Sequence, residues 1–475
     1  MGLFNRTRII PLAAAVAALA AGAWGTAEPS FWRDEAATLS VARRSIPEIF
    51  DLLQHIDAVH GLYYLLMHVF LAAVGSDGSE LAARLPSIVA GAVTAGATAA
   101  IGRRLGGDLL GLLAGLLAAS APMLARFAQE ARPYAMETAL ATLATYLLVR
   151  ALDREGYRPF AGYAAAVVVM AYLNIFSLFL LPAHALTVCL VDRTRFRHWL
   201  AAAAAAGTLV LPLAVIALPQ SGDQLYWIVK PSWTDVGTLI TTFSGGPWLI
   251  APVVLLIIVA LTHRAGPGTD LRLVAAPWLL LPPATLLIVS QVHPFYQHRY
   301  LLFCVPAVAL LVSAGLCRFP LWAALPGAVA LLASMVSLQV PQHAQDSRAD
   351  DIRAVAEIIS HRDKPGDAFY FGSTFYRTCI SAYPRVFAPL RDISLRRSAV
   401  EAADLPGTVV DPATLAQRLR GADRVWLITR LADPGTPMYT EDLARRDLIW
   451  DDRRTWKRVH RWKVRGAAVA LWKRR

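Results

Sequence analysis

Charged residues are scarce in this chain. They make up 17% of its 475 residues, against about 25% in soluble domains. Hydrophobic residues make up 56%. A soluble fold of this length would need more polar side chains to cover its surface, so the composition predicts an integral membrane protein with the lipid bilayer as its first partner.

Cysteine is scarcer still, with four residues in the whole chain. Cys189, Cys304 and Cys317 fall in or beside apolar segments, and Cys379 stands alone in the C-terminal part. No CxxC spacing and no cluster of histidine and cysteine occurs, so neither a disulfide framework nor a zinc site is supported. We expect no metal site and no cofactor.

Acidic residues are fewer than basic ones, and the formal net charge is +12. A basic balance can indicate nucleic-acid binding. In a protein with many membrane spans, however, lysine and arginine are expected in the cytoplasmic loops, and a basic outer surface can meet anionic lipid headgroups. We therefore expect no nucleic-acid partner.

Apolar segments long enough to cross a bilayer recur along the first 340 residues. We expect about eleven spans, near residues 8–25, 80–102, 109–126, 133–151, 160–175, 177–191, 199–217, 248–262, 273–290, 300–316 and 321–338. The basic loops then alternate so that they lie on the side of Arg6 and Arg8. This pattern predicts a multi-pass plasma-membrane protein with a cytoplasmic N-terminus. A signal peptide would also begin with basic residues and an apolar run, but the many later spans favour a retained first helix.

The first outer loop contains a further apolar stretch, residues 60–74, that is short for a span. Counting it as a span would reverse the charge pattern, so we expect a helix that lies in the membrane interface. Residues 34–55 carry apolar side chains at helical spacing and are expected to form a second amphipathic segment. A later outer loop, about 219–247, contains another amphipathic piece at 233–243.

The composition changes near residue 341. Residues 350–359 predict an amphipathic helix, the apolar run 368–371 predicts a strand, and 424–429 and 467–472 predict further strands with a helix at 413–420 between them. The fold class expected is therefore a polytopic α-helical membrane domain, residues 1–340, followed by a small extracytoplasmic α/β domain, residues 341–475.

Four polar clusters fall on the outer side in this topology, where ionisable groups at span mouths indicate a hydrated functional cavity. They are Asp34-Glu35; Asp57, His60 and Tyr64; Glu130, Arg132 and Tyr134; and Tyr296, His298 and Arg299. Any one of these clusters could instead anchor the protein in the membrane interface without a catalytic role, because tyrosine and arginine are common at headgroup depth. All four on one side favour a site.

The residue types suggest a chemistry. Arg132 and Arg299 offer the paired N–H donors that suit a phosphate, with His298 as a further donor. Asp34 could take a proton from an acceptor hydroxyl as general base. An inverting glycosyl transfer needs such a base, a stabilised leaving group and alignment, and here arginines would replace a metal.

The ordered motifs resemble the family-39 glycosyltransferases of the GT-C superfamily, which include protein O-mannosyltransferases and lipid A aminoarabinose transferases. The motifs are Trp-x-Asp-Glu at 32–35, His-Gly-Leu-Tyr at 60–63, Ala-Arg-Leu-Pro-Ser at 83–87, Glu-Ala-Arg-Pro-Tyr at 130–134 and Arg-Tyr-Leu-Leu at 299–302. The resemblance covers about residues 9–340. It implies a polyprenyl-phosphate-sugar donor, an outer active site and Asp34 as the catalytic base. Two departures are Gly61, where many relatives have proline, and the lack of room for a β-trefoil insertion.

The expected function is transfer of a sugar to a glycan, lipid or protein acceptor. Mannose is the more specific expectation for the sugar, and a pentose would also fit. The alternatives are a transporter or flippase of lipid-linked sugars and a non-catalytic scaffold of envelope assembly. A transporter should show matching inverted halves, and no such halves are evident.

Several residue roles stay open. Asp34 could simply cap the helix that follows it, and Glu35 either assists Asp34 or holds Arg33. Asp57, His60, Tyr64, Glu130, Tyr134 and Tyr296 are candidates for the acceptor or sugar pocket, and the tyrosines could equally be interface anchors. His298 could bind phosphate or be structural. Asp350-Asp351 are expected to cap the helix at 350–359 rather than to bind a cation.

Overall fold

The computed structural model describes residues 2–75, 79–225, 228–262, 269–431 and 440–475. The chain folds into two compact units. The first unit contains residues 1–26, 58–63 and 84–341; the second contains 27–57, 64–83 and 342–475. The functional domains 1–340 and 341–475 stay a prediction.

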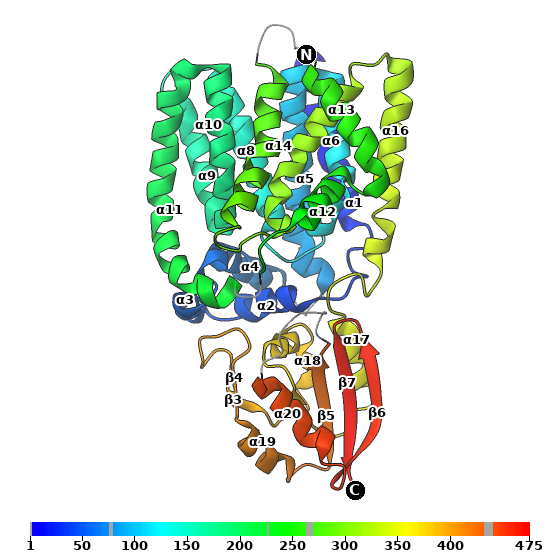
Figure 1. Cartoon of the computed structure of the whole chain (residues 1–475). Coiled ribbons are helices and arrows are strands. Elements are labelled where there is room, and N and C mark those ends of the chain that lie inside the picture. The colour runs from blue at the N-terminus through cyan, green and yellow to red at the C-terminus, as the bar shows by residue number, and fades with distance from the viewer. Residues whose placement is uncertain (1, 76–78, 226–227, 263–268, 432–439) are drawn as a thin grey trace. The chain divides into compact units, whose positions relative to one another are not determined.

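The first unit is a bundle of helices (Figure 1). Its α-helices are α1 (Gly2–Ala23), α5 (Glu80–Gly106, whose first turn belongs to the second unit), α6 (Asp108–Ser120), α7 (Pro122–Ala128), α8 (Tyr134–Leu152), α9 (Ala161–Leu173), α10 (Leu180–Val191), α11 (Phe196–Leu225), α12 (Trp233–Ser244), α13 (Ile250–Thr262), α14 (Leu271–Val289), α15 (Val305–Leu316) and α16 (Leu321–Ser337). Short 3-10 helices join them: η1 (Ala58–His60), η2 (Arg158–Phe160), η3 (Ile175–Phe179), η4 (Arg193–Arg195), η5 (Pro247–Leu249), η6 (His298–Cys304) and η7 (Val340–His343).

Among the described residues, six helices are long and apolar enough to cross a membrane, and eight if each of two bent helix pairs is one span. The pair α6 and α7 bends by 59° at Pro122, whose ring disfavours a helical conformation at Ala121. Helix α12 ends at its C-cap Gly245, which has a left-handed φ of +92°, and it meets the helix that starts at Pro247 at 78°. Three of the remaining predicted spans fall on shorter apolar helices, which begin at Arg8, Arg158 and Ile175. The count of eleven crossings stays a prediction.

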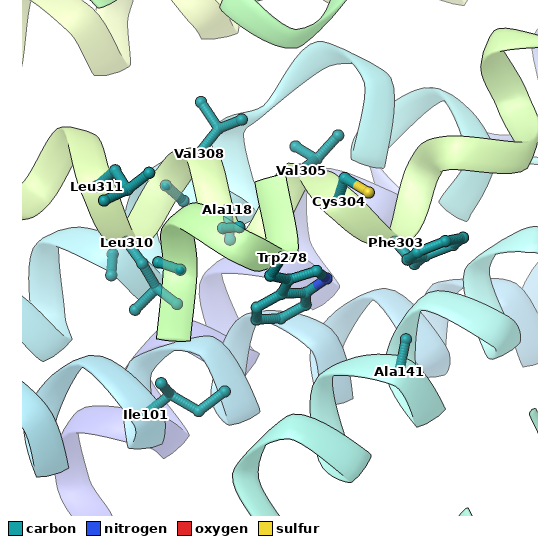
Figure 2. Packing of buried hydrophobic residues seen from close by; sticks show 14 of the residues in the cluster. Ile101, Ala118, Ala141, Trp278, Phe303, Cys304, Val305, Val308, Leu310 and Leu311 are labelled. Atoms are coloured by element: carbon teal, nitrogen blue, oxygen red, sulfur yellow. The ribbon is translucent and has the colours of Figure 1, made fainter. Parts of the chain in front are cut away.

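Small residues let the helices of the bundle pack closely. A Cβ added at Gly115 of α6 would lie 2.5 Å from Cβ of Ala14 in α1 and 2.7 Å from Cβ of Ala99 in α5. Such small-residue contacts are typical of helix packing in membranes. Among the six long apolar helices in the described residues, the one formed by η6 and α15 is the most buried, with 94% of its apolar stretch inside the structure. Figure 2 shows Trp278 of α14 in the same apolar cluster as Val305.

The second unit combines residues 27–57 and 64–83 with the C-terminal residues. Its loop helices are α2 (Arg33–Ala42), α3 (Ile46–His55) and α4 (Gly61–Val74, from Tyr64). The amphipathic segment 34–55 is thus two helices. The break between α2 and α3 has a local cause. The Ser45 side chain caps α3, and the Glu48 carboxylate accepts a hydrogen bond from the Ser45 backbone N–H. Because Ser45 starts a new helix, α2 ends about one turn before it.

The C-terminal part of the second unit is a five-stranded sheet in the order β2-β1-β5-β7-β6. Strands β2 and β5 run parallel to β1, while β7 is antiparallel to β5 and β6. The elements are α17 (Ile352–Ser360), β1 (Ala368–Phe371), η8 (Phe375–Ser381), α18 (Pro384–Phe387), β2 (Arg391–Asp392), β3 (Leu395–Arg397), β4 (Thr408–Val409), α19 (Pro412–Leu419), β5 (Arg424–Arg430), α20 (Thr440–Asp451), β6 (Trp456–Val464) and β7 (Ala467–Arg474). The predicted strands correspond to β1, β5 and β7, and the predicted helices to α17 and α19.

Candidate active site

A rigid connection between α7 and α8 carries Glu130 and Arg132 in the first unit. The Gln129 side chain donates to the carbonyl of Trp24 (2.6 Å), and the Ser87 hydroxyl donates to the carbonyl of Glu130 (2.7 Å). The Arg132 backbone N–H also donates to Glu130 O (2.8 Å). These bonds fix the backbone from which Arg132 and Tyr134 project.

Two guanidinium groups lie against the ring of Tyr134, which is 2% exposed. The Cζ of Arg132 is 6.0 Å from the ring centroid and the Cζ of Arg299 is 5.8 Å from it. Arg299 also lies 5.7 Å from the ring of Tyr300, which stacks on Phe176. The fold therefore brings together two arginines that the sequence places on separate segments, and Tyr134 is their common platform.

Further ionisable groups surround these arginines. His60 Nε2 lies 3.0 Å from Arg132 Nη2, so His60 contacts a residue that is predicted to bind phosphate. Arg126 forms an ion pair with Glu130 (3.0 Å), and His298 is exposed and close enough to Arg126 to interact with its charge. Three guanidinium groups thus lie in the same region of the first unit as the carboxylates of Glu130 and Asp235. This excess of positive charge suits an anion.

Asp34 and Glu35 lie in the first turn of α2, in the second unit. The N-cap of α2 is Trp32, without a side-chain capping bond, so the interpretation of Asp34 as the cap is wrong. Asp34 is partly buried and Glu35 fully buried. The side chain that holds Arg33 is Asp350, through Nε (2.7 Å) and Nη2 (2.9 Å).

Asp57 and Tyr64 form a second polar pair in the same unit, because the Tyr64 hydroxyl donates to the Asp57 carboxylate. Asp57 has a φ of +64°. Ala403 is the only other non-glycine residue with a positive φ in the described part of the chain. An aspartate held in the left-handed region is strained, and such strain gathers at functional sites.

Tyr296 forms its hydrogen bond with α12 and not with the arginine cluster. Its hydroxyl donates to the carbonyl of Asp235 in α12 (3.4 Å), and the side chain is 6% exposed. Burial, with the nearby Asp235 charge, raises the pKa of Tyr296 to about 12. Tyr296 is thus a neutral hydroxyl that links its loop to α12.

The predicted residues consequently fall into two sets. His60, Glu130, Arg132, Tyr134, Tyr296, His298 and Arg299 belong to the first unit, and Asp34, Glu35, Asp57 and Tyr64 to the second. The contacts of Arg126 with Glu130 and of Asp350 with Arg33 were not predicted. Arg126 could have been found, since it precedes Glu130 by one helical turn, the spacing of helix ion pairs. Among the described residues, no group of three or more histidine, cysteine, aspartate or glutamate side chains could hold a metal.

Comparison with known proteins gives one family match over part of the chain and several similar folds. Residues 59–219 match the family model described as dolichyl-phosphate-mannose-protein mannosyltransferase. A search of curated protein sequences found no match. The fold is similar to that of ArnT from Cupriavidus metallidurans bound to undecaprenyl phosphate, with a TM-score of 0.67 and 12% identity over 98% of this chain and 97% of that one.

Two larger proteins share the fold more distantly. The arabinofuranosyltransferase AftD from Mycobacteria has a TM-score of 0.50 at 16% identity, covering 98% of this chain and 41% of that chain. The oligosaccharyltransferase of Archaeoglobus fulgidus, in complex with zinc and sulfate, has a TM-score of 0.50 at 11% identity, covering 89% and 68%.

Proposed function

We propose that the chain is a glycosyltransferase of the GT-C superfamily, and that it transfers one sugar from a polyprenyl-phosphate carrier to an acceptor on the outer side of the membrane. The observation that supports this most is the pair of guanidinium groups on the Tyr134 ring. Two guanidinium groups on one buried aromatic residue place positive charge in this part of the first unit, and positive charge suits a phosphate anion.

The leaving group of the proposed reaction is such an anion. When the acceptor oxygen attacks the anomeric carbon, the bond from that carbon to the phosphate oxygen breaks and its electron pair stays on the phosphate. The departing polyprenyl phosphate gains negative charge at this moment. Arg132 and Arg299, with His60 and His298 beside them, are proposed to stabilise that charge as N–H donors.

The acceptor hydroxyl must lose its proton in the same reaction. We propose Asp34 as the general base that takes it, with Glu35 as its buried neighbour, so that the products are a glycoside of inverted configuration and polyprenyl phosphate. Asp57 and Tyr64 are proposed to bind the acceptor or the sugar, together with Glu130 and Tyr134. Arginine donors would supply the charge stabilisation without a divalent metal.

Mannose is the sugar we propose, since the matching family model is that of mannosyltransferases. A pentose is the next choice. The acceptor is proposed to be a glycan, a lipid or a protein. The proposed orientation keeps the N-terminus in the cytoplasm and the C-terminal residues outside.

The test is a transfer assay with the purified full-length chain and a panel of polyprenyl-phosphate sugars, including mannose and arabinose. Release of free polyprenyl phosphate with one sugar, dependent on an added acceptor, is the expected result. A polyprenyl-diphosphate sugar is the matched control and should not react. Movement of the lipid-linked sugar across proteoliposomes without release of polyprenyl phosphate would contradict the proposal and favour a flippase.

A further inference from the structure

The segment that leads to Asp34 is bound by C-terminal residues of the second unit. The Ser30 N–H donates to the carbonyl of Gln345 (2.9 Å), and the Ser30 hydroxyl accepts from the backbone N–H of Arg353 (2.8 Å). The Arg353 guanidinium also donates to the carbonyl of Ala27 (2.7 Å) and pairs with Glu80 (2.7 Å). The backbone before α2 is thus anchored over several residues to partners more than 300 positions away in sequence.

The last of these anchors is adjacent to Asp34. The Asp350 carboxylate accepts from Nε and Nη2 of Arg33 and also from the Arg33 backbone N–H (3.1 Å). One carboxylate therefore fixes both the side chain and the backbone of the residue that opens α2. The Asp350 side chain is fully buried. Two parallel N–H···O bonds together with a backbone bond leave Arg33 a single geometry.

The environment of Asp350 favours this geometry further. The backbone N–H of its neighbour Asp351 donates to the carbonyl of Arg465 (3.0 Å) in the β6–β7 turn. A Cβ at Gly466 in that turn would lie 2.3 Å from Asp350 Oδ1, so the turn packs directly against the carboxylate. Burial, with the Asp350 charge nearby, raises the pKa of the Cys379 thiol well above its usual value, so Cys379 stays neutral beside the ion pair.

The other end of α2 is held in the same way. The Arg43 guanidinium donates to the carbonyl of Ser381 at the end of η8, and Arg44 donates to the carbonyl of Asp404 (2.6 Å). Helix α2 also packs along η8 between these two ends. The helix that carries Asp34 is therefore fixed at its start, along its side and at its end by residues 350–404.

A buried ion pair contributes little net stability, because the cost of desolvating both charges offsets their attraction. What it does supply is a defined position. We infer that Asp350, through Arg33, is a positioning residue that fixes the place of Asp34 for proton removal from the acceptor. This inference rests on the proposed function, and it gives the C-terminal residues a direct part in the reaction rate.

The chain offers a matched control. Asp367 makes an ion pair of the same form with Arg424, through Nε (2.8 Å) and Nη2 (3.2 Å), and its side chain is 2% exposed. Asp367 immediately precedes β1 and Arg424 begins β5, so this pair lies at one end of two neighbouring strands of the sheet. Asp350→Asn and Asp367→Asn therefore remove the same charge from the same kind of site.

The experiment compares these two variants of the full chain with Arg33→Lys and Asp34→Asn. Misplacement of a catalytic group by about 1 Å can cost a hundredfold in rate, so Asp350→Asn should lower kcat roughly tenfold to a hundredfold, with the donor KM nearly unchanged. Asp367→Asn should keep kcat within about twofold of the wild type at a similar loss of thermal stability. Arg33→Lys keeps the positive charge but loses the paired N–H donors of the guanidinium, so its kcat should fall between those of the two aspartate variants.

Hydrogen–deuterium exchange gives a second measurement that does not depend on activity. The amides of residues 33–42 should exchange faster in Asp350→Asn and as in the wild type in Asp367→Asn. Equal kcat and equal exchange in the two variants would overturn the inference. Absence of transfer by the wild type, or full transfer by Asp34→Asn, would instead refute the proposed function, and the exchange result would still decide whether Asp350 holds α2.

Discussion

Arg132→Ala is expected to weaken the binding of polyprenyl phosphate. Arg132 is 6% exposed, contacts His60 at 3.0 Å and lies over the ring of Tyr134, so its donors are already oriented before any ligand arrives. A hydrogen bond to a charged group contributes about 1.5–3 kcal/mol. Loss of one such bond corresponds to a Kd roughly 10- to 150-fold higher.

Arg150→Ala is the control for this measurement. Arg150 lies on the same helix, α8, and its Cζ is 5.7 Å from the ring centroid of Tyr146, so it forms the same kind of arginine–tyrosine stack. Its removal should leave the Kd unchanged. The assay is titration of each detergent-purified variant with a short-chain polyprenyl phosphate, followed by intrinsic fluorescence or calorimetry. Equal affinities for Arg132→Ala and Arg150→Ala would refute the assignment of Arg132 as a phosphate ligand.

Three further outcomes are expected. Gly315→Ala should destabilise the chain by about 3 kcal/mol, because its Cβ would lie 2.1 Å from the carbonyl oxygen of Leu256, whereas Gly207→Ala, with open space around it, should unfold within a few degrees of the wild type. Tyr163→Phe removes the hydroxyl that contacts Nδ1 of His184 (3.1 Å), so thermal unfolding in detergent should show a loss of about 1–3 kcal/mol with kcat unchanged; an unaltered melting temperature would contradict this role. Transfer should continue after dialysis against EDTA, and activity that returns only with added Mg²⁺ or Mn²⁺ would show that arginines do not replace a metal.

The elements that the sequence predicted correctly are those with a local signal. The strand β1 coincides with its predicted run, residues 368–371, because four consecutive apolar residues between turn residues are buried on both faces. Strand β6 was not predicted. Its sequence, WKRVHRWKV, has charged residues on both faces because it is an exposed edge strand, so the alternation that marks a half-buried strand is missing.

The site was predictable in residue type but not in pairing. Arg132, Arg299 and Tyr134 were singled out because arginine and tyrosine at span mouths suit a phosphate, yet their meeting at one ring depends on how α8 and η6 pack. Asp350 and Asp351 illustrate the same limit. Asp351 caps α17 as predicted, accepting from the Ala354 N–H (3.0 Å), whereas Asp350 binds Arg33 instead. Capping is a local property, and a partner 317 residues away leaves no trace in a single sequence.

The role of Asp34 as general base is tested by the rate of polyprenyl-phosphate release by Asp34→Asn under saturating donor and acceptor. General-base catalysis contributes about 10²–10⁴-fold, so this isosteric change should lower kcat at least about a hundredfold while donor binding and folding persist. Asp51→Asn, an exposed carboxylate on α3 in the same unit, should be as fast as the wild type. Release by Asp34→Asn at the rate of Asp51→Asn would contradict the proposal that Asp34 is the general base.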